Sequence, residues 1–311
     1  MTPKIIRFIT DPDYRFKRNA MRGHYRSMPD DKYLTRMYHA KVGRDLHLDH
    51  PQTLNEKLQW LKIHDRKPIY TQMVDKLAAK DFVARRIGEK YLIETLGCWD
   101  TFDQIDFQAL PRQFVLKCTH DSGGLVICRD KTALDMNEAR KKISASLSRN
   151  YYYKYREWPY KDVKPRILAE TYLEEDGASA AGTEPVLHDY KLQCFDGKFD
   201  NIFVAEGRFS SRGVRYHYFD RNWTYIPYCP YDGLVMDDLQ ALKPKCFEEM
   251  ISIAEELSKG LPQLRVDLYE INGKVYFGEM TFYSQSGFDI DITEEADRIL
   301  GSKLTLPAPN A

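Results

Sequence analysis

The sequence has no excess of charge of either sign. Its 46 lysine and arginine residues balance 46 aspartate and glutamate residues, and the isoelectric point is near neutral. A protein whose main partner is a nucleic acid usually presents a strongly basic field to the phosphate backbone. The balanced charge therefore argues against nucleic acid as a partner.

The sequence also has no long apolar run. No segment approaches the roughly 20 apolar residues that a membrane-spanning helix needs, so no integral membrane segment is expected. The first 22 residues carry charges throughout and lack the apolar stretch of a secretory signal peptide. Both features favour a cytoplasmic protein.

Cysteine patterns that hold metals are missing as well. The six cysteines form no Cys-x-x-Cys pair and no Cys/His spacing of a zinc site. Several lie inside apolar, strand-like segments, where cysteine behaves as a small hydrophobic residue. They are expected to be reduced core thiols, as is usual in the cytosol.

At 311 residues the chain can bury a sizeable core, and two or three lobes are expected. The aromatic content of 13%, with 21 tyrosines, is high. It is compatible with a carbohydrate-facing cleft and also with ordinary core and surface tyrosines. The aromatic and basic tract at residues 150–160 leaves a similar pair of alternatives open, because it can stack on a sugar or pack between lobes.

The most informative segment is a predicted β-hairpin at residues 263–281. Its two halves each alternate apolar and polar side chains, and Asn272-Gly273 between them is the strongest short signal for a hairpin. A two-residue loop would put Glu279 on the face opposite Asp267. A three-residue loop that begins one residue earlier puts both carboxylates on one face, and this is the register that we predict.

The three-residue loop pairs Arg265 with Glu279 and places Asp267 on the same face. Two acidic side chains on one face, followed by the hydroxyl of Thr281, are typical of a site that holds Mg²⁺ against a polyphosphate. The alternative is an exposed hairpin edge that carries charge. The opposite face is expected to carry the apolar side chains, namely Val266, Leu268, Tyr276 and Met280.

A second predicted hairpin surrounds a glycine-rich loop. An apolar strand at residues 113–118 leads into the loop His120–Gly124, and another strand follows at residues 125–129. The two glycines at the end of the loop let backbone N–H groups approach an anion closely, which makes the loop a candidate phosphate cover. A plain hairpin turn is the alternative, since the Gly-Lys-Ser/Thr of a Walker loop is missing.

Capping and turn signals predict further elements. Thr53–Glu56 is a capping box that opens a helix, a second helix is expected at residues 69–87, and a strand is expected at residues 91–96. An Asp-Gly turn at residues 196–197 predicts another hairpin. Because hairpins make antiparallel sheets, an α+β fold is expected. One face of the first strand of this hairpin is expected to carry Asp189, Lys191 and Gln193.

The order of these segments resembles the ATP-grasp superfamily, in which two α+β lobes with antiparallel sheets clamp ATP. The chain more closely resembles the TupA-like family, which is named for teichuronopeptide synthesis and is common in polysaccharide-synthesis gene clusters. The resemblance extends from about Pro51 to Phe288, whereas residues 1–50 match the family poorly. It is carried by Leu54–Lys62, Val74–Lys76, Phe114–Gly123, Arg156–Tyr160, Lys164–Ile167, Asp189–Lys191 and Arg265–Tyr269.

The resemblance implies an ATP site. Lys117 would neutralise phosphate oxygens, the backbone of Glu170–Leu173 would meet adenine, and an acid among residues 174–176 would bind ribose. Lys191 would reach the γ-phosphate, with Asp189 orienting it. The expected ATP-binding residues are Lys76, Lys117, Ser122, Gly123, Gly124, Glu170, Thr171, Tyr172, Leu173, Asp176, Asp189 and Lys191.

The same resemblance implies Mg²⁺ held by Asp267, Glu279 and Thr281, although many ATP-grasp enzymes have asparagine at the last of these positions. Arg265 would steady an acyl phosphate or an oxyanion by its fixed positive charge. The expected catalytic residues are Arg265, Lys191 and His120.

The implied activity is that of a carboxylate–amine ligase that forms ADP and phosphate. The acid is expected to be a uronic acid of a surface polysaccharide or its precursor, and the amine an amino acid or small amine. Other polysaccharide-synthesis enzymes are candidate partners. Arginines that could grip an acidic sugar are Arg149, Arg156, Arg208, Arg212 and Arg215.

Four regions are expected along the chain. They are an N-terminal helical segment at residues 1–75, an ATP-grasp subdomain A at 76–165, a subdomain B at 166–295 and a C-terminal tail at 296–311.

Three other activities stay open. A glycosyltransferase is one, because Asp289-Ile-Asp291 looks like its metal motif, but that fold usually needs a parallel sheet. An ATP-dependent sugar kinase is the second. A non-catalytic carbohydrate-binding protein that uses the aromatic tract is the third.

Overall fold

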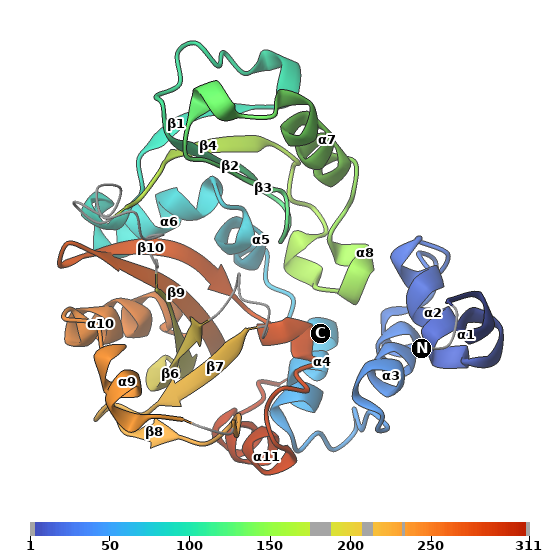
Figure 1. Ribbon diagram of the computed structural model, residues 1–311. Helices are drawn as coiled ribbons and strands as arrows, with labels where there is room; N and C mark the ends of the chain where they lie inside the picture. Colours follow the sequence, from blue (N-terminus) through green and yellow to red (C-terminus); the bar gives the residue numbers. More distant parts are fainter. Residues whose placement is uncertain (1–3, 175–187, 207–213, 232–233, 309–311) are drawn as a thin grey trace.

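A computed structural model describes residues 4–174, 188–206, 214–231 and 234–308. Figure 1 shows an N-terminal helical region and two lobes, each built on a sheet whose described strands pair antiparallel. This agrees with the hairpin signals and disagrees with the parallel sheet of a glycosyltransferase. The predictions for Glu175, Asp176, Arg208 and Arg212 lie outside the described residues.

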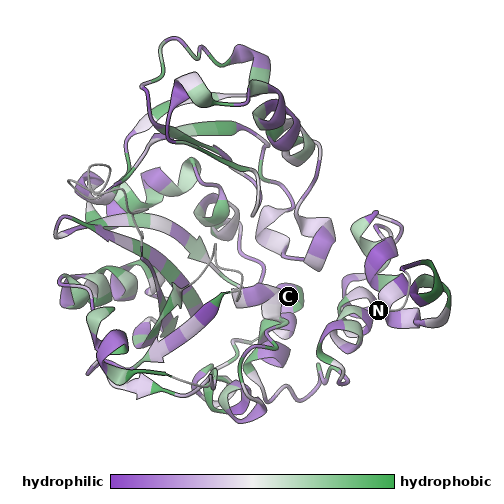
Figure 2. Cartoon of the chain, viewed as in Figure 1, coloured by the Kyte–Doolittle hydropathy of each residue, from purple (hydrophilic) through white to green (hydrophobic). Residues whose placement is uncertain are grey.

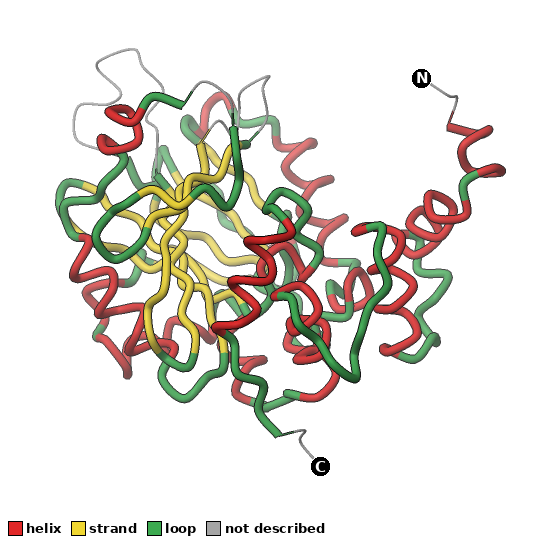
Figure 3. The backbone as a smooth tube through the Cα atoms, turned by 90° about the horizontal axis from the view of Figure 1, so that it is seen from below, coloured by secondary structure: helices red, strands yellow, loops and turns green. Residues whose placement is uncertain are grey.

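The N-terminal region consists of α1 (Lys4–Thr10), α2 (Pro12–Met21) and α3 (Asp30–Val42), which lie to one side of the molecule (Figure 1, Figure 3). Asp11 caps α2 by accepting a hydrogen bond from the backbone N–H of Tyr14 at 2.8 Å. The helices α2 and α3 share a small core of their own: Phe16, Ala20, Tyr33, Leu34, Met37, Tyr38, Ala40 and Leu46, joined by Phe288.

The predicted capping box is confirmed at the start of α4 (Leu54–His64). The backbone N–H of Glu56 donates to Thr53 Oγ1 at 3.2 Å, and the Glu56 carboxylate accepts from the backbone N–H of Thr53 at 3.0 Å. The packing partner of α4 is α11 (Glu294–Lys303), so much of the expected C-terminal tail is a packed helix.

The single helix predicted at residues 69–87 is wrong. The chain forms α5 (Ile69–Val74) and α6 (Ala78–Ile87), with a break between them. The Asp75 carboxylate accepts hydrogen bonds from the backbone N–H groups of Leu77 and Ala78, at 2.9 and 3.4 Å. An aspartate that satisfies backbone donors in this way competes with helix continuation and starts a new helix.

The first lobe is a four-stranded sheet with the order β1 (Thr95–Trp99), β4 (Ile167–Thr171), β2 (Phe114–Cys118) and β3 (Leu125–Cys128). The strand predicted at residues 91–96 is wrong, because residues 89–91 form a 3₁₀ turn and β1 begins at Thr95. Since β4 pairs with both β1 and β2, this lobe extends past the expected boundary at residue 165.

The helix α7 (Met136–Leu147) covers one face of the first sheet, and Asp135 caps its start by accepting from the backbone N–H groups of Asn137 and Glu138. Figure 2 shows the hydrophilic colour over most of α7 and the hydrophobic colour along β4. The buried side of the helix meets the strands in one core, which contains Phe114, Leu116, Ala139, Ile143, Ile167 and Ala169.

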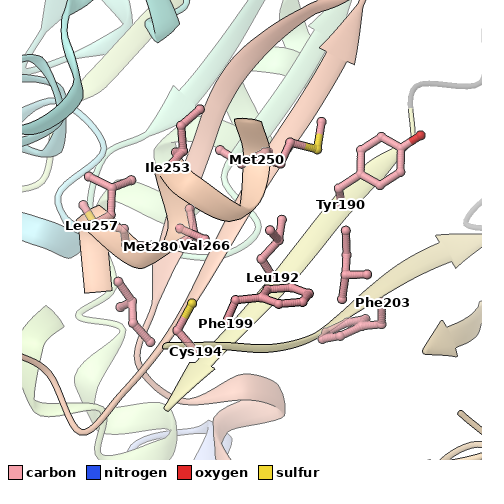
Figure 4. Packing of buried hydrophobic residues seen from close by; sticks show 14 of the residues in the cluster. Tyr190, Leu192, Cys194, Phe199, Phe203, Met250, Ile253, Leu257, Val266 and Met280 are labelled. Atoms are coloured by element: carbon pink, nitrogen blue, oxygen red, sulfur yellow. The ribbon is translucent and has the colours of Figure 1, made fainter. Parts of the chain in front are cut away.

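The second lobe is a six-stranded sheet with the order β10 (Lys274–Thr281), β9 (Gln263–Ile271), β5 (Asp189–Phe195), β6 (Lys198–Glu206), β7 (Arg215–Phe219) and β8 (Tyr225–Ile226). The helix α10 (Phe247–Ser258) packs on one face, and α9 (Met236–Ala241) precedes it. Figure 4 shows this contact, in which Met250, Ile253 and Leu257 face the strands. The strands contribute Tyr190, Leu192, Cys194, Val266 and Met280 to the same core.

The alternation predicted for β5 is confirmed, since Tyr190, Leu192 and Cys194 face this core. Asp189, Lys191 and Gln193 therefore lie on the other face of the sheet. All six cysteines are free thiols, as the sequence predicted.

The β9–β10 turn differs from the prediction. It is a two-residue turn, with Asn272 at φ 52° and Gly273 at φ 72°, and not the three-residue loop expected. The ladder slips between Phe277 and Glu279, where Gly278 is an extra residue, so that Glu279 faces Asp267. The predicted pairing of Arg265 with Glu279 is therefore wrong, although their sharing of one face is confirmed.

The same register corrects the apolar face of this hairpin. Tyr276 lies opposite Tyr269, so it shares the face of Asp267 and not the face of Val266. Val275 and Phe277 take the expected place of Tyr276 in the core.

Candidate active site

A cavity of about 330 Å³ lies between the two lobes. The first lobe and the break before α6 contribute Lys76, Lys117 and the loop Asp121–Gly124 to its lining. The second lobe contributes the polar face of β5, β9 and β10, through Asp189, Lys191, Arg265, Asp267, Gly278 and Glu279. The predicted glycine-rich loop, the strand that carries Asp189 and Lys191 and the predicted acidic hairpin therefore meet in one place.

Asp267 is the most tightly held carboxylate in the cavity. Arg265 grips it in a bidentate way, with Nε 2.6 Å from Oδ1 and Nη2 2.8 Å from Oδ2, and Lys191 donates to Oδ2 as well. Burial acts to raise the pKa of Asp267, but Arg265 and Lys191 overcome it and lower the pKa below its usual value. The carboxylate is therefore ionised.

Glu279 lies beside this cluster and is more open. Arg265 Nη2 lies 3.5 Å from Glu279 Oε1 and donates to Thr281 Oγ1 at 3.0 Å. The side chain of Glu279 is 41% exposed, against 2% for Asp267. Glu279 can therefore meet a ligand from the cavity without losing a buried partner.

Lys117 reaches the cavity from the first sheet. Its Nζ lies 2.6 Å from Glu170 Oε2, while Lys80 Nζ lies 2.6 Å from the other oxygen of the same carboxylate. Burial acts to raise the pKa of Glu170, but Lys117 and Lys80 lower it below 4.5. Only Lys117 of the two lysines lines the cavity.

The glycine loop is fixed from two sides. Lys76 Nζ donates to the backbone oxygen of Asp121, and the Asp121 carboxylate accepts from the backbone N–H of Gly124 at 3.2 Å. A Cβ on Gly124 would lie 2.7 Å from the sulfur of Cys118, so no larger residue fits there. Gly123 has φ 140°, which favours glycine. Both glycines are therefore needed for the conformation of the loop.

His120 does not line the cavity. It is 1% exposed, and its Nε2 lies 3.2 Å and 3.0 Å from the backbone oxygens of Ser146 and Arg149. This geometry favours anchoring of the glycine loop to the end of α7 over the catalytic role that was expected.

The expected adenine residues Glu170–Leu173 do not line the cavity, and neither does Glu174, the one expected ribose residue that the structure describes. Glu170 is occupied by two lysines, Thr171 Oγ1 donates to Glu94 at 3.0 Å, and Tyr172 OH lies 3.4 Å from Arg129. Leu173 is partly buried and makes no contact with the cavity. The adenine role of Glu170–Leu173 stays a prediction.

Arg156 does not belong to the site. It is 1% exposed, donates from Nη2 to the backbone oxygens of Tyr25 and Met28 at 2.7 and 3.1 Å, and lies 3.2 Å from Asp30. These contacts join α8 (Tyr152–Tyr155) to the N-terminal region. The expectation that Arg156 grips a sugar is therefore wrong.

The cavity also has an aromatic wall that was not predicted from the sequence. Phe203, Tyr216 and Tyr218 come from β6 and β7, and the ring of Phe203 stacks on Tyr218 with centroids 4.7 Å apart. Their alternation along the strands was visible, but nothing in the sequence assigned that face to the site.

The segment after β10 also lines the cavity, through Ser284, Gln285 and Asp289. Gln285 and Ser286 have φ 48° and 56°, which is unusual for residues other than glycine. Arg265 Nη1 donates to Ser284 Oγ at 3.1 Å, and Gln285 Nε2 donates to Tyr216 OH at 3.2 Å.

A buried lysine holds this segment from behind. Lys62 is 0% exposed and donates to Gln59 Oε1, Tyr155 O and Ser286 O at 2.9, 3.0 and 2.7 Å. Ser286 Oγ donates to the Glu157 carboxylate at 2.6 Å. Burial lowers the pKa of Lys62 to about 7, against the opposing pull of Glu157.

The donor set suits Mg²⁺ bound together with phosphate. Asp267 and Glu279 face each other across two strands, with the Thr281 hydroxyl 3.4 Å from Glu279 Oε1. The described residues contain no group of three or more His, Cys, Asp and Glu side chains that could hold a metal alone. Mg²⁺ is commonly bound by one or two carboxylates plus substrate phosphates, so the pair fits such a shared site.

A protein-family profile described as TupA-like ATPgrasp matches residues 56–305. A search of curated proteins found no match. None of the described helices has the length and hydropathy needed to cross a bilayer.

A comparison with solved structures matched the chain to several proteins. D-alanine–D-alanine ligase from Bacillus anthracis, complexed with ATP, shares 15% identity, with 73% of this chain and 55% of that chain covered and a TM-score of 0.38. D-cycloserine synthetase DcsG shares 14% identity, with 76% of this chain and 72% of that chain covered and a TM-score of 0.40. The ATP-grasp ligase PsnB, complexed with minimal precursor, Mg and ADP, shares 9% identity, with 86% of this chain and 66% of that chain covered and a TM-score of 0.37. The chain thus spans little more than half the length of the first of these proteins.

Proposed function

Because the chain belongs to the TupA-like ATP-grasp family, we propose that it is an ATP-dependent ligase that joins a carboxylate to an amine. The observation that carries this proposal is the cavity between the lobes. There, cationic side chains from the first lobe face a buried cluster of acids and bases on the second. Such a cavity suits a triphosphate with its divalent ion.

The triphosphate would be held by charge from both lobes. Lys76 and Lys117 line the cavity from one side and Lys191 from the other, and lysine is a usual point-charge partner of phosphate. The backbone of Ser122, Gly123 and Gly124 lines the same space and would cover the phosphates. Asp189, 2.8 Å from Lys191, keeps that ammonium group in place.

Mg²⁺ would be held by Asp267 and Glu279, with Thr281 as a weaker third donor. When bound, it would neutralise phosphate charge and orient the γ-phosphoryl group. Asp267 already shares its charge with Arg265 and Lys191, so the exposed Glu279 is the residue that most directly meets the ion.

In the proposed reaction the substrate carboxylate attacks the γ-phosphorus of ATP, which gives an acyl phosphate and ADP. The amine then attacks the acyl carbon, forming the amide and releasing phosphate. Arg265 is locked by Asp267 and Ser284, so its positive charge is preorganised for the oxyanion that develops at this carbon. Activation is needed because amide formation from a free carboxylate is uphill in water.

For the acid we propose a uronic acid of a surface polysaccharide or of its precursor. The family resemblance suggests this class, and the aromatic wall of Phe203, Tyr216 and Tyr218 supports it. A sugar presents C–H groups that pack well against aromatic faces, while its carboxylate would turn toward Arg265. The second candidate, a sugar kinase, would use the same ATP site and aromatic wall.

The test is ADP release measured over a grid of uronic acids and amino acids, with mass spectrometry of each product. A ligase gives inorganic phosphate and an amide, whereas a kinase gives a phosphorylated sugar and no free phosphate. Beforehand, a thermal-shift assay with a non-hydrolysable ATP analogue and Mg²⁺ examines the site alone. If neither compound stabilises the protein, the proposed function is excluded.

A further inference from the structure

Two carboxylates that line the cavity, Asp121 and Asp289, form no ion pair with a cation of the described residues. The Asp121 carboxylate is taken up by its own surroundings, since it accepts from the backbone N–H of Gly124 at 3.2 Å and from Ser146 Oγ.

Asp189 and Asp267 contact Lys191, and Glu279 lies 3.5 Å from Arg265. For Asp289, no lysine, arginine or histidine of the described residues provides an ion pair within 4.0 Å. Yet Asp289 lines the same cavity. It is therefore a negative group that faces the substrate space without a cation from the described part of the protein.

Asp289 is also held in a defined position. Its backbone N–H donates to Asn55 Oδ1 at 2.8 Å, and its backbone oxygen accepts from Asn55 Nδ2 at 2.9 Å. Its Oδ1 accepts from the backbone N–H of Asp291 at 3.0 Å. Hydrogen bonds therefore fix both the backbone and the carboxylate of Asp289.

The surroundings of Asp289 favour a positive ligand. Burial, together with the negative charges of Asp291 and Asp297, raises the pKa of Asp289 to about 6. On the side of β7 and the segment after β8, its charge also helps to raise the pKa values of Tyr218 and Cys229. A cation would relieve this accumulation of negative charge.

We propose that Asp289, in the cavity that Tyr216 and Gln285 also line, binds the ammonium group of the amine substrate and takes one proton from it. This inference rests on the proposed ligase function and names the class of its second substrate, a primary amine that is protonated in solution. The lysines and Arg265 attract the triphosphate and the acid, so Asp289 gives the cavity a complementary site for the opposite charge. It also gives Asp289 of the Asp289-Ile-Asp291 motif a role other than that of the glycosyltransferase metal motif it resembles.

The proton balance is simple. The ammonium group gives one proton to the Asp289 carboxylate and becomes a neutral amine with a free electron pair. That pair forms the C–N bond at the acyl carbon, the C–O bond to the phosphoryl group breaks, and the second nitrogen proton leaves with the phosphate. Asp289 then returns its proton to water.

Hydroxylamine separates this role from the rest of the reaction, because it is largely uncharged near neutral pH and traps an acyl phosphate as a hydroxamate. The assay contains ATP, Mg²⁺, D-glucuronate or D-galacturonate, and either hydroxylamine or each of the amino acids. In Asp289→Asn we expect hydroxamate formation within about threefold of wild type and amide formation lowered about thirtyfold or more, through the KM of the amino acid. Asp289→Glu should recover part of the amide formation.

The matched control is Asp291→Asn, which removes the same charge two residues away from an exposed side chain that does not line the cavity. It should change neither product by more than about twofold. Equal loss of hydroxamate and amide in Asp289→Asn, or no loss of amide, overturns the assignment while the ligase function stands. If wild type forms neither product with any pair, the proposed function is wrong and the inference is wrong with it.

Discussion

Glu279 lies directly opposite Asp267 in the β9–β10 ladder, although the two-residue turn of this hairpin would by itself put Glu279 in the core. The extra residue is Gly278, which shifts the register between Phe277 and Glu279. Bulges of this kind re-aim a side chain near functional sites. One glycine therefore decides that the two acids meet in the cavity.

Gly278→Ala should weaken use of MgATP. A Cβ at this position would lie 3.0 Å from the backbone oxygen of Asp267 and 3.0 Å from the ring of Tyr269, so β9 must move by a few tenths of an ångström. We expect the KM for MgATP to rise several-fold, with a loss of about 1–2 kcal/mol in the free energy of unfolding. Steady-state ADP release and urea denaturation measure the two effects. An unchanged KM would show that the bulge does not position Glu279 for the nucleotide.

Glu279→Gln keeps the shape of the side chain and removes its charge. We expect ATP-dependent turnover to fall about a hundredfold or more, as for the loss of a preorganised electrostatic group. Higher Mg²⁺ should recover part of the activity, since the amide is a weaker ligand. Because the side chain is 41% exposed, the melting temperature should hardly change. Turnover close to that of wild type would remove Glu279 from the site.

Lys117 and Lys80 form a matched pair, since both contact Glu170 at 2.6 Å and only Lys117 lines the cavity. Lys117→Ala should lower turnover about a hundredfold. Lys80→Ala removes an equivalent ion pair and should lower turnover less than about threefold, with similar loss of stability. Measurements of kcat and of the unfolding free energy of both variants show whether Lys117 contributes to turnover beyond its ion pair with Glu170. Equal turnover in the two variants would mean that Lys117 only holds Glu170.

The hairpin carrying Asp267 and Glu279 was predictable from the sequence, because alternating side chains around Asn-Gly leave little choice of element. Its detailed register was not, because a three-residue loop and a two-residue turn with a bulge bring the same acids together. The slip at Gly278 also moved Tyr276 to the site face. A glycine inside the strand was the available signal.

Other parts of the site depend on contacts between distant segments, which a single sequence does not display. Lys76 was placed on a helix, but Asp75 interrupts that helix, and the Lys76 backbone N–H donates to Thr119 O at 3.1 Å. Histidine in a glycine-rich loop is typical of a catalytic residue. His120 is buried, however, and its ring lies within hydrogen-bonding distance of two backbone oxygens. The aromatic wall looked like ordinary strand sequence, because a face becomes functional only when another lobe closes over it.

Lys62→Met should destabilise the protein. The ammonium group of Lys62 satisfies two backbone oxygens and a glutamine oxygen in an interior position, and it lies close enough to Glu157 for their charges to interact. Removing one buried member of such a network leaves the others unpaired, and we expect a loss of about 3 kcal/mol in urea denaturation. Lys142→Met, on the exposed face of α7, is the control and should change stability by less than about 0.5 kcal/mol. Equal stability of the two variants would contradict the role of Lys62.

Asp289→Asn should make the protein more stable near neutral pH while impairing amine use. The folded pKa of Asp289 is raised to about 6, whereas the unfolded carboxyl ionises near 3.8. Between these values the folded state binds the extra proton, so wild-type stability falls as the pH rises through this window, and the cost persists above it. The shift in pKa corresponds to a loss of about 3 kcal/mol in the free energy of unfolding of wild type. Because Asp289 is partly solvated, we expect the variant to regain about 1–2 kcal/mol of this free energy.

Urea denaturation of wild type and Asp289→Asn at about pH 4 and about pH 7.5 measures this difference. The gain should be present at the higher pH and nearly absent at the lower one, since wild-type Asp289 is then mostly protonated in the folded state. Asp291→Asn should show no comparable dependence. A variant less stable than wild type at both pH values would mean that the carboxylate supports the fold, and the strain attributed to an unpaired negative charge would not exist. A gain confined to neutral pH, together with lost amide formation, would show that the protein keeps a destabilising carboxylate because its substrate needs one.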